Sequence, residues 1–488
     1  MPYRTSIPTG SATLLGVAIA ALSLPVLHAR SQPVPILNPT LEIIADAPLP
    51  GDRLGTALSI DAGRLLVGAT PTPLPPSFPQ PRPGFAAIFD AQTGAQLLTL
   101  TPADSAPSDA FGSAVALQSN IAAVGAPAAF DQSSAELGQT GTAYLFSAVS
   151  GAQFFQLTPP NLAAGDAFGS SIAITDAHVS VGAPFRSTTQ PVAGAVDLFS
   201  ALNGQHTATL VAPPADAIPG ALFGNALAVN ATTIAIGAPG EPNPGAFDDP
   251  TAGPFAGAVY LFDLATHQLI ARLTPPNTAA GDRFGAAVSL SSTTLAVGAP
   301  GRDAGADDSG AVYLYSLTSL TTPTTLALPG ATGPAPTAAF GTTVALTEAL
   351  LAVGAPGVDR GTLNTGAAFL FDATTAEPLR DLFRTDLDAL DAFGTAVATD
   401  EDLIAASVPL ADHSGVSEAG LIAMFRALAR CGPADIASPR GLLDLGDIDA
   451  FVVAFLDGNT DADLAPPTGV IDLDDIDAFI QSFLAGCP

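Results

Sequence analysis

The chain has 488 residues and a formal net charge of −30, and all fifteen of its basic residues are arginine. Phosphate backbones and anionic lipid repel an acidic chain that has no basic stripe, so nucleic acid and membrane surfaces are poor partners. The absence of lysine also excludes Schiff-base chemistry and a P-loop lysine.

Residues 1–30 have the features of an export signal. Arg4 supplies the positive end, residues 14–24 form the apolar core, and His28-Ala29 is a candidate cleavage boundary. Cleavage after Ala29 leaves Leu27 where a small residue is usual, so a site one or two residues later is the alternative. The apolar run is too short to cross a membrane comfortably. We therefore expect a secreted or cell-surface protein. Residues 31–40 are rich in proline, which predicts an extended leader.

A short motif ending in glycine then recurs along the chain. Its copies are GDRLG at Gly51, SDAFG at Ser108, GDAFG at Gly165, GALFG at Gly220, GDRFG at Gly281, AAFG at Ala338 and DAFG at Asp391. The final glycines of successive copies are 53 to 61 residues apart. A period this regular indicates a repeat architecture, in which each unit is one supersecondary piece.

Each repeat predicts four short strands. In the fifth copy these are residues 285–290, 295–299, 310–315 and a segment around 324–328. The first and third alternate apolar and polar or small residues, and the turn between the first two is only a few residues long, as a hairpin requires. Four antiparallel strands repeated seven times predict an all-β fold, a seven-bladed β-propeller over residues 41–429.

The two ends of this region predict how the ring closes. Residues 41–45 precede the first motif as the fourth strand precedes later copies, but they have no blade of their own. The last copy shows the complementary gap, because no fourth strand follows residues 420–425. We expect residues 41–45 to complete the seventh blade, since an unpaired strand edge exposes backbone donors and acceptors.

The motif residues themselves are those of a scaffold. The phenylalanine of the motif supplies one large ring per blade, and the Gly-Ala-Pro that follows the second strand ends that strand sharply. This pattern resembles the FG-GAP repeat proteins, which are similar to the headpiece of integrin α chains and to exported bacterial propellers. Integrin-type repeats often carry an Asp-rich calcium loop between FG and GAP. Here that interval is SLSSTT or ITDAH, so no calcium ligand is assigned to the propeller.

The longest connections all fall on one rim of the expected propeller. They are residues 70–83, 128–140, 240–256 and 301–309. Because loops on a rigid scaffold are where recognition usually lies, we expect this rim to bind a protein, a glycan or a cation. The candidate contacts are Asp248, Asp249, Asp303, Asp307 and Asp308. For any one of them, a solvated acidic turn is the alternative interpretation.

Catalytic motifs are scarce. The five histidines are scattered, and neither an HExxH pair nor a G-x-S-x-G elbow is present. We therefore expect a non-catalytic binding or adhesion protein. The alternative is an extracellular hydrolase or lyase acting on polysaccharide or peptide, with an acidic pair such as Asp248 and Asp249 across a cleft.

Residues 431–488 form a separate unit with an internal duplication. The segment ADIASPRGLLDLGDIDAFVVAFLDG aligns with ADLAPPTGVIDLDDIDAFIQSFLAG, 28 residues later. Each half predicts an acidic loop followed by a short helix, with two phenylalanines four residues apart on one face.

This tail resembles a dockerin module, two EF-hand-like loop-helix units in tandem that attach a protein to an extracellular or surface partner. The resemblance implies calcium, which takes six to eight hard oxygen ligands. The residues that match the loop positions are Asp435, Asp444 and Asp447, with Asp463, Asp472 and Asp475 in the second half. Each loop is one residue longer than usual. Asp447 and Asp475 also stand where an acid stabilises a helix N-terminus, so helix capping is the alternative interpretation.

The chain has two cysteines, Cys431 and Cys487, and they bracket the tail. In an exported protein an even pair at the two ends of a small domain predicts a disulfide.

Overall fold

The computed structural model describes residues 36–71, 84–102, 104, 106, 109–127, 140–214, 216–242, 255–275, 278–329, 336–360, 363–384, 386–427, 448, 451–453, 455, 476 and 478–480. All of them belong to the second of two compact units, residues 34–488. The expected export signal lies outside the described residues. In the part of the chain that the structure describes, no helix is long and apolar enough to span a membrane.

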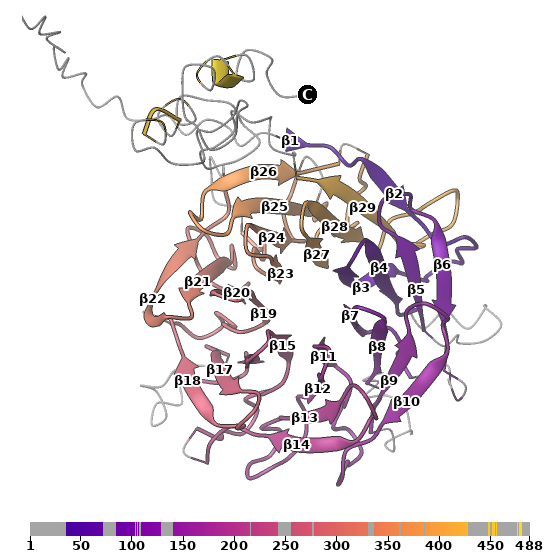
Figure 1. Cartoon of the computed structure of the whole chain (residues 1–488), viewed down its shortest axis with the longest axis vertical. Coiled ribbons are helices and arrows are strands. Elements are labelled where there is room, and N and C mark those ends of the chain that lie inside the picture. Colours follow the sequence, from indigo (N-terminus) through magenta and orange to yellow (C-terminus); the bar gives the residue numbers. More distant parts are fainter. Residues whose placement is uncertain are drawn as a thin grey trace, which may run out of the picture. The chain divides into compact units, whose positions relative to one another are not determined.

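The described residues form 29 strands in seven sheets, arranged as the blades of a ring (Figure 1). Blade 1 contains β3 (Leu54–Asp61), β4 (Arg64–Ala69), β5 (Phe85–Asp90) and β6 (Gln96–Leu100). Blade 2 contains β7 (Ala114–Gln118), β8 (Ile121–Ala126), β9 (Thr142–Ser147) and β10 (Gln153–Leu157). Blade 3 contains β11 (Ser171–Ile174), β12 (His178–Ala183), β13 (Ala195–Ser200) and β14 (His206–Leu210). Blade 4 contains β15 (Ala226–Val229), β16 (Thr233–Ala238), β17 (Ala258–Asp263) and β18 (Leu269–Leu273).

The remaining three blades complete the ring. Blade 5 contains β19 (Ala287–Leu290), β20 (Thr294–Ala299), β21 (Ala311–Ser316) and β22 (Ser319–Leu326). Blade 6 contains β23 (Thr343–Leu346), β24 (Leu350–Ala355), β25 (Ala367–Asp372), β26 (Pro378–Leu382) and β1 (Ile36–Leu37). Blade 7 contains β27 (Val397–Asp400), β28 (Leu403–Val408), β29 (Leu421–Arg426) and β2 (Leu41–Ile43). The predicted seven-bladed propeller is confirmed.

The N-terminal segment closes the ring as predicted. β2 pairs with β29 in antiparallel register, Leu41 opposite Met424 and Ile43 opposite Ile422. One strand was not expected: within the leader, Ile36 and Leu37 form β1, which pairs in parallel with the outer edge of β26. The leader was predicted only to be extended, because it is rich in proline. Its apolar pair Ile36-Leu37 nevertheless pairs with the free edge of β26.

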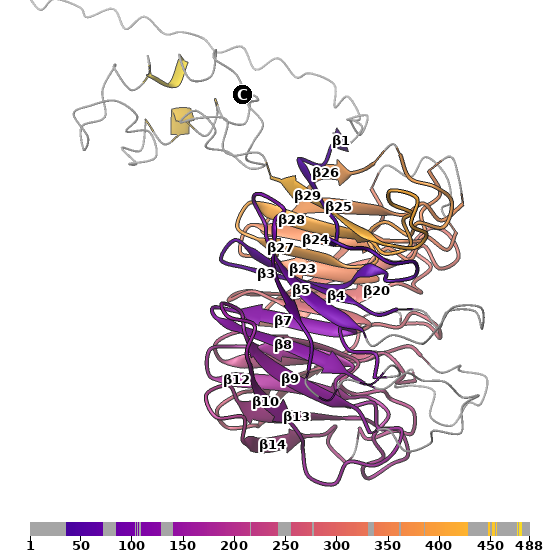
Figure 2. The same ribbon diagram turned by 90° about the vertical axis from the view of Figure 1, so that its right-hand side faces the viewer.

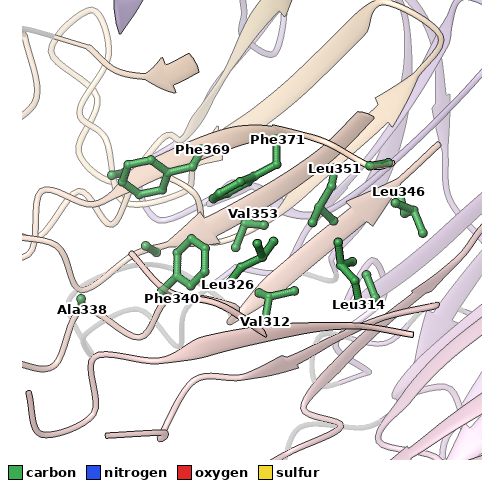
Figure 3. Close-up of a cluster of buried hydrophobic side chains, with 14 of the residues drawn as sticks. Val312, Leu314, Leu326, Ala338, Phe340, Leu346, Leu351, Val353, Phe369 and Phe371 are labelled. Atoms are coloured by element: carbon green, nitrogen blue, oxygen red, sulfur yellow. The ribbon is translucent and has the colours of Figure 1, made fainter. Parts of the chain in front are cut away.

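Apolar clusters fill the spaces between neighbouring blades. Figure 3 shows the cluster between blades 5 and 6, where Phe340 meets Phe369 and Phe371 edge to face, with ring centroids 5.9 Å apart in both pairs. Edge-to-face geometry is the arrangement that aromatic rings prefer. The motif phenylalanines of the other copies are likewise fully buried, which confirms their scaffold role: Phe111, Phe168, Phe223, Phe284 and Phe393.

The two glycines of the repeat touch each other across the blade boundary. A Cβ added to the GAP glycine Gly125 would overlap the carbonyl oxygen of Gly169, the FG glycine of the next blade. The same overlap occurs at six boundaries: Gly68 with Gly112, Gly125 with Gly169, Gly182 with Gly224, Gly237 with Gly285, Gly298 with Gly341 and Gly354 with Gly394. The FG glycines also have φ between 85° and 98°, a region that disfavours residues with a Cβ.

The seventh copy departs from the motif at the closing boundary. Ser407 stands at the GAP glycine position, and a Cβ added to the facing Gly55 would lie 2.7 Å from the Ser407 Cβ. The Ser407 hydroxyl accepts a hydrogen bond from the Ala396 backbone N–H at 2.9 Å, so the polar side chain is satisfied within its own blade. At this boundary a serine therefore faces a glycine, whereas the other six boundaries pair two glycines.

Gly125→Ala is expected to destabilise the protein by about 3 kcal/mol or more, because backbone and not a flexible side chain occupies the space of the new Cβ. The control is Gly165→Ala, where φ is +84° and nothing lies within 4 Å of the added Cβ. The unfolding free energy of that variant should fall by only about 1 kcal/mol, the conformational cost of alanine at a positive φ. Denaturant unfolding of both proteins measures the difference, and equal losses would contradict the contact argument.

Candidate functional site

The connections between the second and third strands of each blade lie on one rim of the ring, together with the blade-to-blade segments. We call this side the loop rim; Figure 2 shows the ring from the side, with the strands running between its two rims. The described connections on this rim include residues 184–194 in blade 3, 300–310 in blade 5 and 409–420 in blade 7. These three loops are nearly equal in length but differ in sequence from blade to blade, whereas the strands beneath them repeat.

In blade 3, a buried charge network anchors the rim loop. Nη1 of Arg186 contacts Asp197 Oδ2 at 2.8 Å, and Nε contacts Asp166 Oδ2 at 3.3 Å. Asp197 is fully buried in β13, where blades 2, 4 and 5 carry tyrosine, and it also accepts hydrogen bonds from His206 Nε2 and the Thr209 hydroxyl. Buried charges persist only when they are paired and hydrogen-bonded, so this network fixes the start of loop 184–194.

In blade 4, the rim loop carries a buried carboxylate at the position where blade 3 has Arg186. Glu241, at the start of the connection from β16 to β17, is fully buried and accepts hydrogen bonds from the Tyr260 hydroxyl and, at 2.5 Å, from Arg272 Nη2. Burial raises the pKa of Glu241, while the Arg272 charge opposes that rise. The glutamate is inaccessible to solvent and holds the loop by its base; it is not placed to act on a ligand.

Three more ion pairs anchor the loops of the other blades. Arg302 Nη1 contacts Asp282 Oδ2 at 2.9 Å, and Arg360 Nη2 contacts Asp381 Oδ2 at 2.6 Å. Arg53 Nη2 contacts Glu418 Oε2 at 2.9 Å across the boundary between blades 1 and 7. Together with Arg186 and Arg272, five arginines near the loop rim therefore form ion pairs with carboxylates of the protein itself.

The structure separates the roles of the predicted rim aspartates. The Asp303 carboxylate accepts the Asp308 backbone N–H at 2.9 Å, and so it closes its own loop. Asp359 and Asp412 do the same in blades 6 and 7, accepting from the N–H of Asn364 and Glu418. This recurrence was not predicted, although the sequence carries a signal for it: each of the three aspartates stands three residues after the proline that follows the second strand.

Asp307 and Asp308 contact the next blade through their backbones. Their carbonyl oxygens accept the N–H of Thr337 at 2.9 Å and of Ala339 at 3.1 Å, while their side chains are exposed. These two carboxylates are therefore available to a ligand on the rim. Asp248 and Asp249 lie outside the described residues.

The predicted residues of the tail also lie outside the described part of the chain. This holds for Asp435, Asp444, Asp447, Asp463, Asp472 and Asp475, and for Cys431 and Cys487. Within the described residues, no group of three or more histidine, cysteine or acidic side chains is arranged to hold a metal ion.

The innermost strands of all seven blades enclose a cavity of about 300 Å³. Its lining holds no titratable side chain among the described residues, and Ser59, Ser289 and Thr399 are its polar side chains. The hydroxyls of Ser59 and Ser289 accept the N–H of Leu117 at 2.9 Å and of Leu346 at 3.0 Å, both on the next blade. These serines join blades, and the cavity offers no acid or base for catalysis.

Two segments of the chain, residues 95–146 and 268–315, match the family model described as FG-GAP repeat. The chain contains FG-GAP repeats. Each matched segment starts at the fourth strand of one blade and ends at the third strand of the next, from β6 to β9 and from β18 to β21. The FG-GAP unit of sequence is therefore offset by one strand from the blade. No curated protein matches the chain.

Asp303→Ala should remove a hydrogen bond to the loop backbone and lower the unfolding free energy by about 1 kcal/mol. Limited proteolysis should then cut within residues 301–309 faster than in the parent protein. Asp307→Asn is the matched control, because its exposed carboxylate makes no such bond, and it should leave both measurements unchanged. Equal proteolysis of the two variants would show that Asp303 does not build the loop.

Proposed function

We propose that this is an exported, non-catalytic binding protein whose loop rim recognises an extracellular ligand and whose C-terminal module attaches it to a surface or an extracellular partner. One observation carries the first half of the proposal. The blades repeat in their strands and glycine contacts, but the loops on one rim differ, and blade-specific buried ion pairs anchor them. Rigid, unequal loops on a repeated scaffold favour recognition over chemistry.

The charge of the rim narrows the class of ligand. Five arginines are already paired inside the protein, whereas the carboxylates of Asp307 and Asp308 are exposed, and the chain carries a net charge of −30. These two exposed carboxylates offer negative charge and hydrogen-bond acceptors on the rim. A basic patch on a partner protein, the hydroxyls of a glycan or a bound cation fits them.

The described part of the tail supports a paired module. Its helical residues are 448, 451–453 and 455 in the first half and 476 and 478–480 in the second. Phe451 and Phe479, which occupy equivalent positions of the duplication, stack with ring centroids 4.1 Å apart and planes 17° apart. Val452 and Ile480, also equivalent, are 48% and 45% exposed. We propose a dockerin-like module that contacts its partner through such apolar side chains.

Calcium is the cofactor proposed for this module. The six aspartates at the matching loop positions supply carboxylate oxygens, the donors that calcium prefers in proteins. Bound calcium would neutralise these carboxylates and so remove the repulsion between them. Each loop would then be held against its helix.

The rim proposal is tested by screening the full secreted chain against a glycan array, a panel of extracellular proteins and a hydrolase substrate panel. Joint replacement of Asp303, Asp307 and Asp308 by asparagine should weaken capture of any ligand found by at least tenfold. The matched control replaces the exposed Glu377 and Glu401 of the opposite rim by glutamine and should keep full binding. Unchanged binding in the rim variant would contradict the proposal, and turnover of a substrate would favour the hydrolase.

Calcium binding is tested by calorimetric titration of the full chain. The parent protein should take up calcium, and a variant with Asp435 and Asp463 changed to asparagine should lose most of the heat, because these residues match the first position of each loop. The rim variant serves as the control and should bind calcium like the parent. Absence of heat in the parent would favour the helix-capping role.

A further inference from the structure

The N-terminal segment is engaged with the propeller from Ile36 onward. β1 pairs with β26, and the Leu37 carbonyl accepts the Phe383 N–H at 3.4 Å. The backbone N–H and the hydroxyl of Thr40 both donate to the Met424 carbonyl, at 2.8 Å and 3.2 Å. The ladder of β2 with β29 follows at once. Ten successive residues, 36–45, thus bind the outer strands of two blades.

The side chains of this segment complete the core and pair with an arginine. Ile43 is fully buried and Ala45 is 7% exposed. Glu42 Oε1 lies 2.7 Å from Nη1 of Arg384, whose side chain is only 5% exposed. Without Glu42, Arg384 would retain Asp386 as its carboxylate partner, at 2.6 Å. Removal of residues 36–45 would therefore leave a strand edge unpaired, apolar side chains exposed and Arg384 with one carboxylate partner fewer.

We propose that the cleavage that removes the export signal is confined to a narrow window, so that the mature chain starts between Arg30 and Ile36. This inference rests on the proposed export. The upper limit comes from the structure, since any start beyond Ile36 cuts into β1, and any start beyond Leu41 also cuts into β2, the strand that closes the ring. The lower limit comes from the apolar core of the signal and the boundary at His28-Ala29. The sequence alone does not fix how far beyond Ala29 the chain is cleaved.

The same pairing sets when the ring can close. β2 lies near the start of the chain, but its partner β29 is the last strand of the propeller. Residues 41–43 therefore stay unpaired until residues 421–426 have been synthesised.

The direct test is intact-mass analysis and N-terminal sequencing of the full chain recovered from the medium. The expected N-terminus lies within residues 30–36. An exported, folded chain that starts at Leu37 or later overturns this inference alone. A chain that stays inside the cell with its first thirty residues attached overturns the proposed export, and this inference with it.

A second measurement separates the closing role from simple failure to fold. Ile43→Ala removes buried apolar volume and should lower the melting temperature of the secreted full chain by several degrees. Ile36→Ala makes the same change at a residue that is 58% exposed and should leave the melting temperature nearly unchanged. A start at Asp46 behind the same signal should give aggregated or earlier-melting protein, whereas a start at Ser31 should melt like the parent. Equal melting of all four proteins would overturn the inference.

Discussion

The structure depends on a contact between two glycine backbones at the boundary of neighbouring blades. The GAP glycine of one blade lies against the FG glycine of the next, as Gly237 does against Gly285, and neither position has room for a Cβ. This close approach sets the spacing of the inner strands. A buried phenylalanine beside six of the FG glycines, and the buried Leu54 beside Gly55, then fill the space between the blades. The two parts of the motif recur together because each needs a partner in the adjacent repeat.

The offset between repeat and blade explains how the ring closes. A unit of sequence runs from the fourth strand of one blade to the third strand of the next, so the first unit begins with a strand that has no blade of its own. That strand is β2, and blade 7 supplies the matching vacancy beside β29. A closed ring leaves no blade without its outer strand, and β1 adds a further pairing on the neighbouring blade 6.

Much of the fold could be predicted from the sequence because the repeat presents the same pattern seven times. Strand positions, blade number and the closing role of residues 41–45 all follow from periodicity and from which strand each end lacks. The anchors of the loop rim could not be predicted in this way. Asp197 replaces a tyrosine of the repeat, and its pairing with Arg186 depends on how the loop folds back over its blade. Glu241 and Arg272 lie 31 residues apart and meet only through the sheet.

The candidate site was predicted less completely, for a physical reason. A surface aspartate looks the same in a sequence whether its carboxylate faces solvent or accepts a backbone N–H. The structure distinguishes Asp303, which closes its loop, from Asp307 and Asp308, whose carboxylates are exposed. Periodicity reveals what the blades share. Ligand recognition is proposed for the parts that differ, and those parts carry no repeated signal.

The central claim is that a closed, uniformly stable ring supports rim loops that alone respond to a ligand. Native-state hydrogen exchange of the full chain tests this claim most directly. The account predicts that the Ile43 amide in β2 exchanges as slowly as amides of β29 and of the inner strands, because they open together. Amides in residues 303–308 should exchange faster and slow down when ligand binds. Exchange of β2 as fast as that of the rim loop would show that the N-terminal strand does not close the ring.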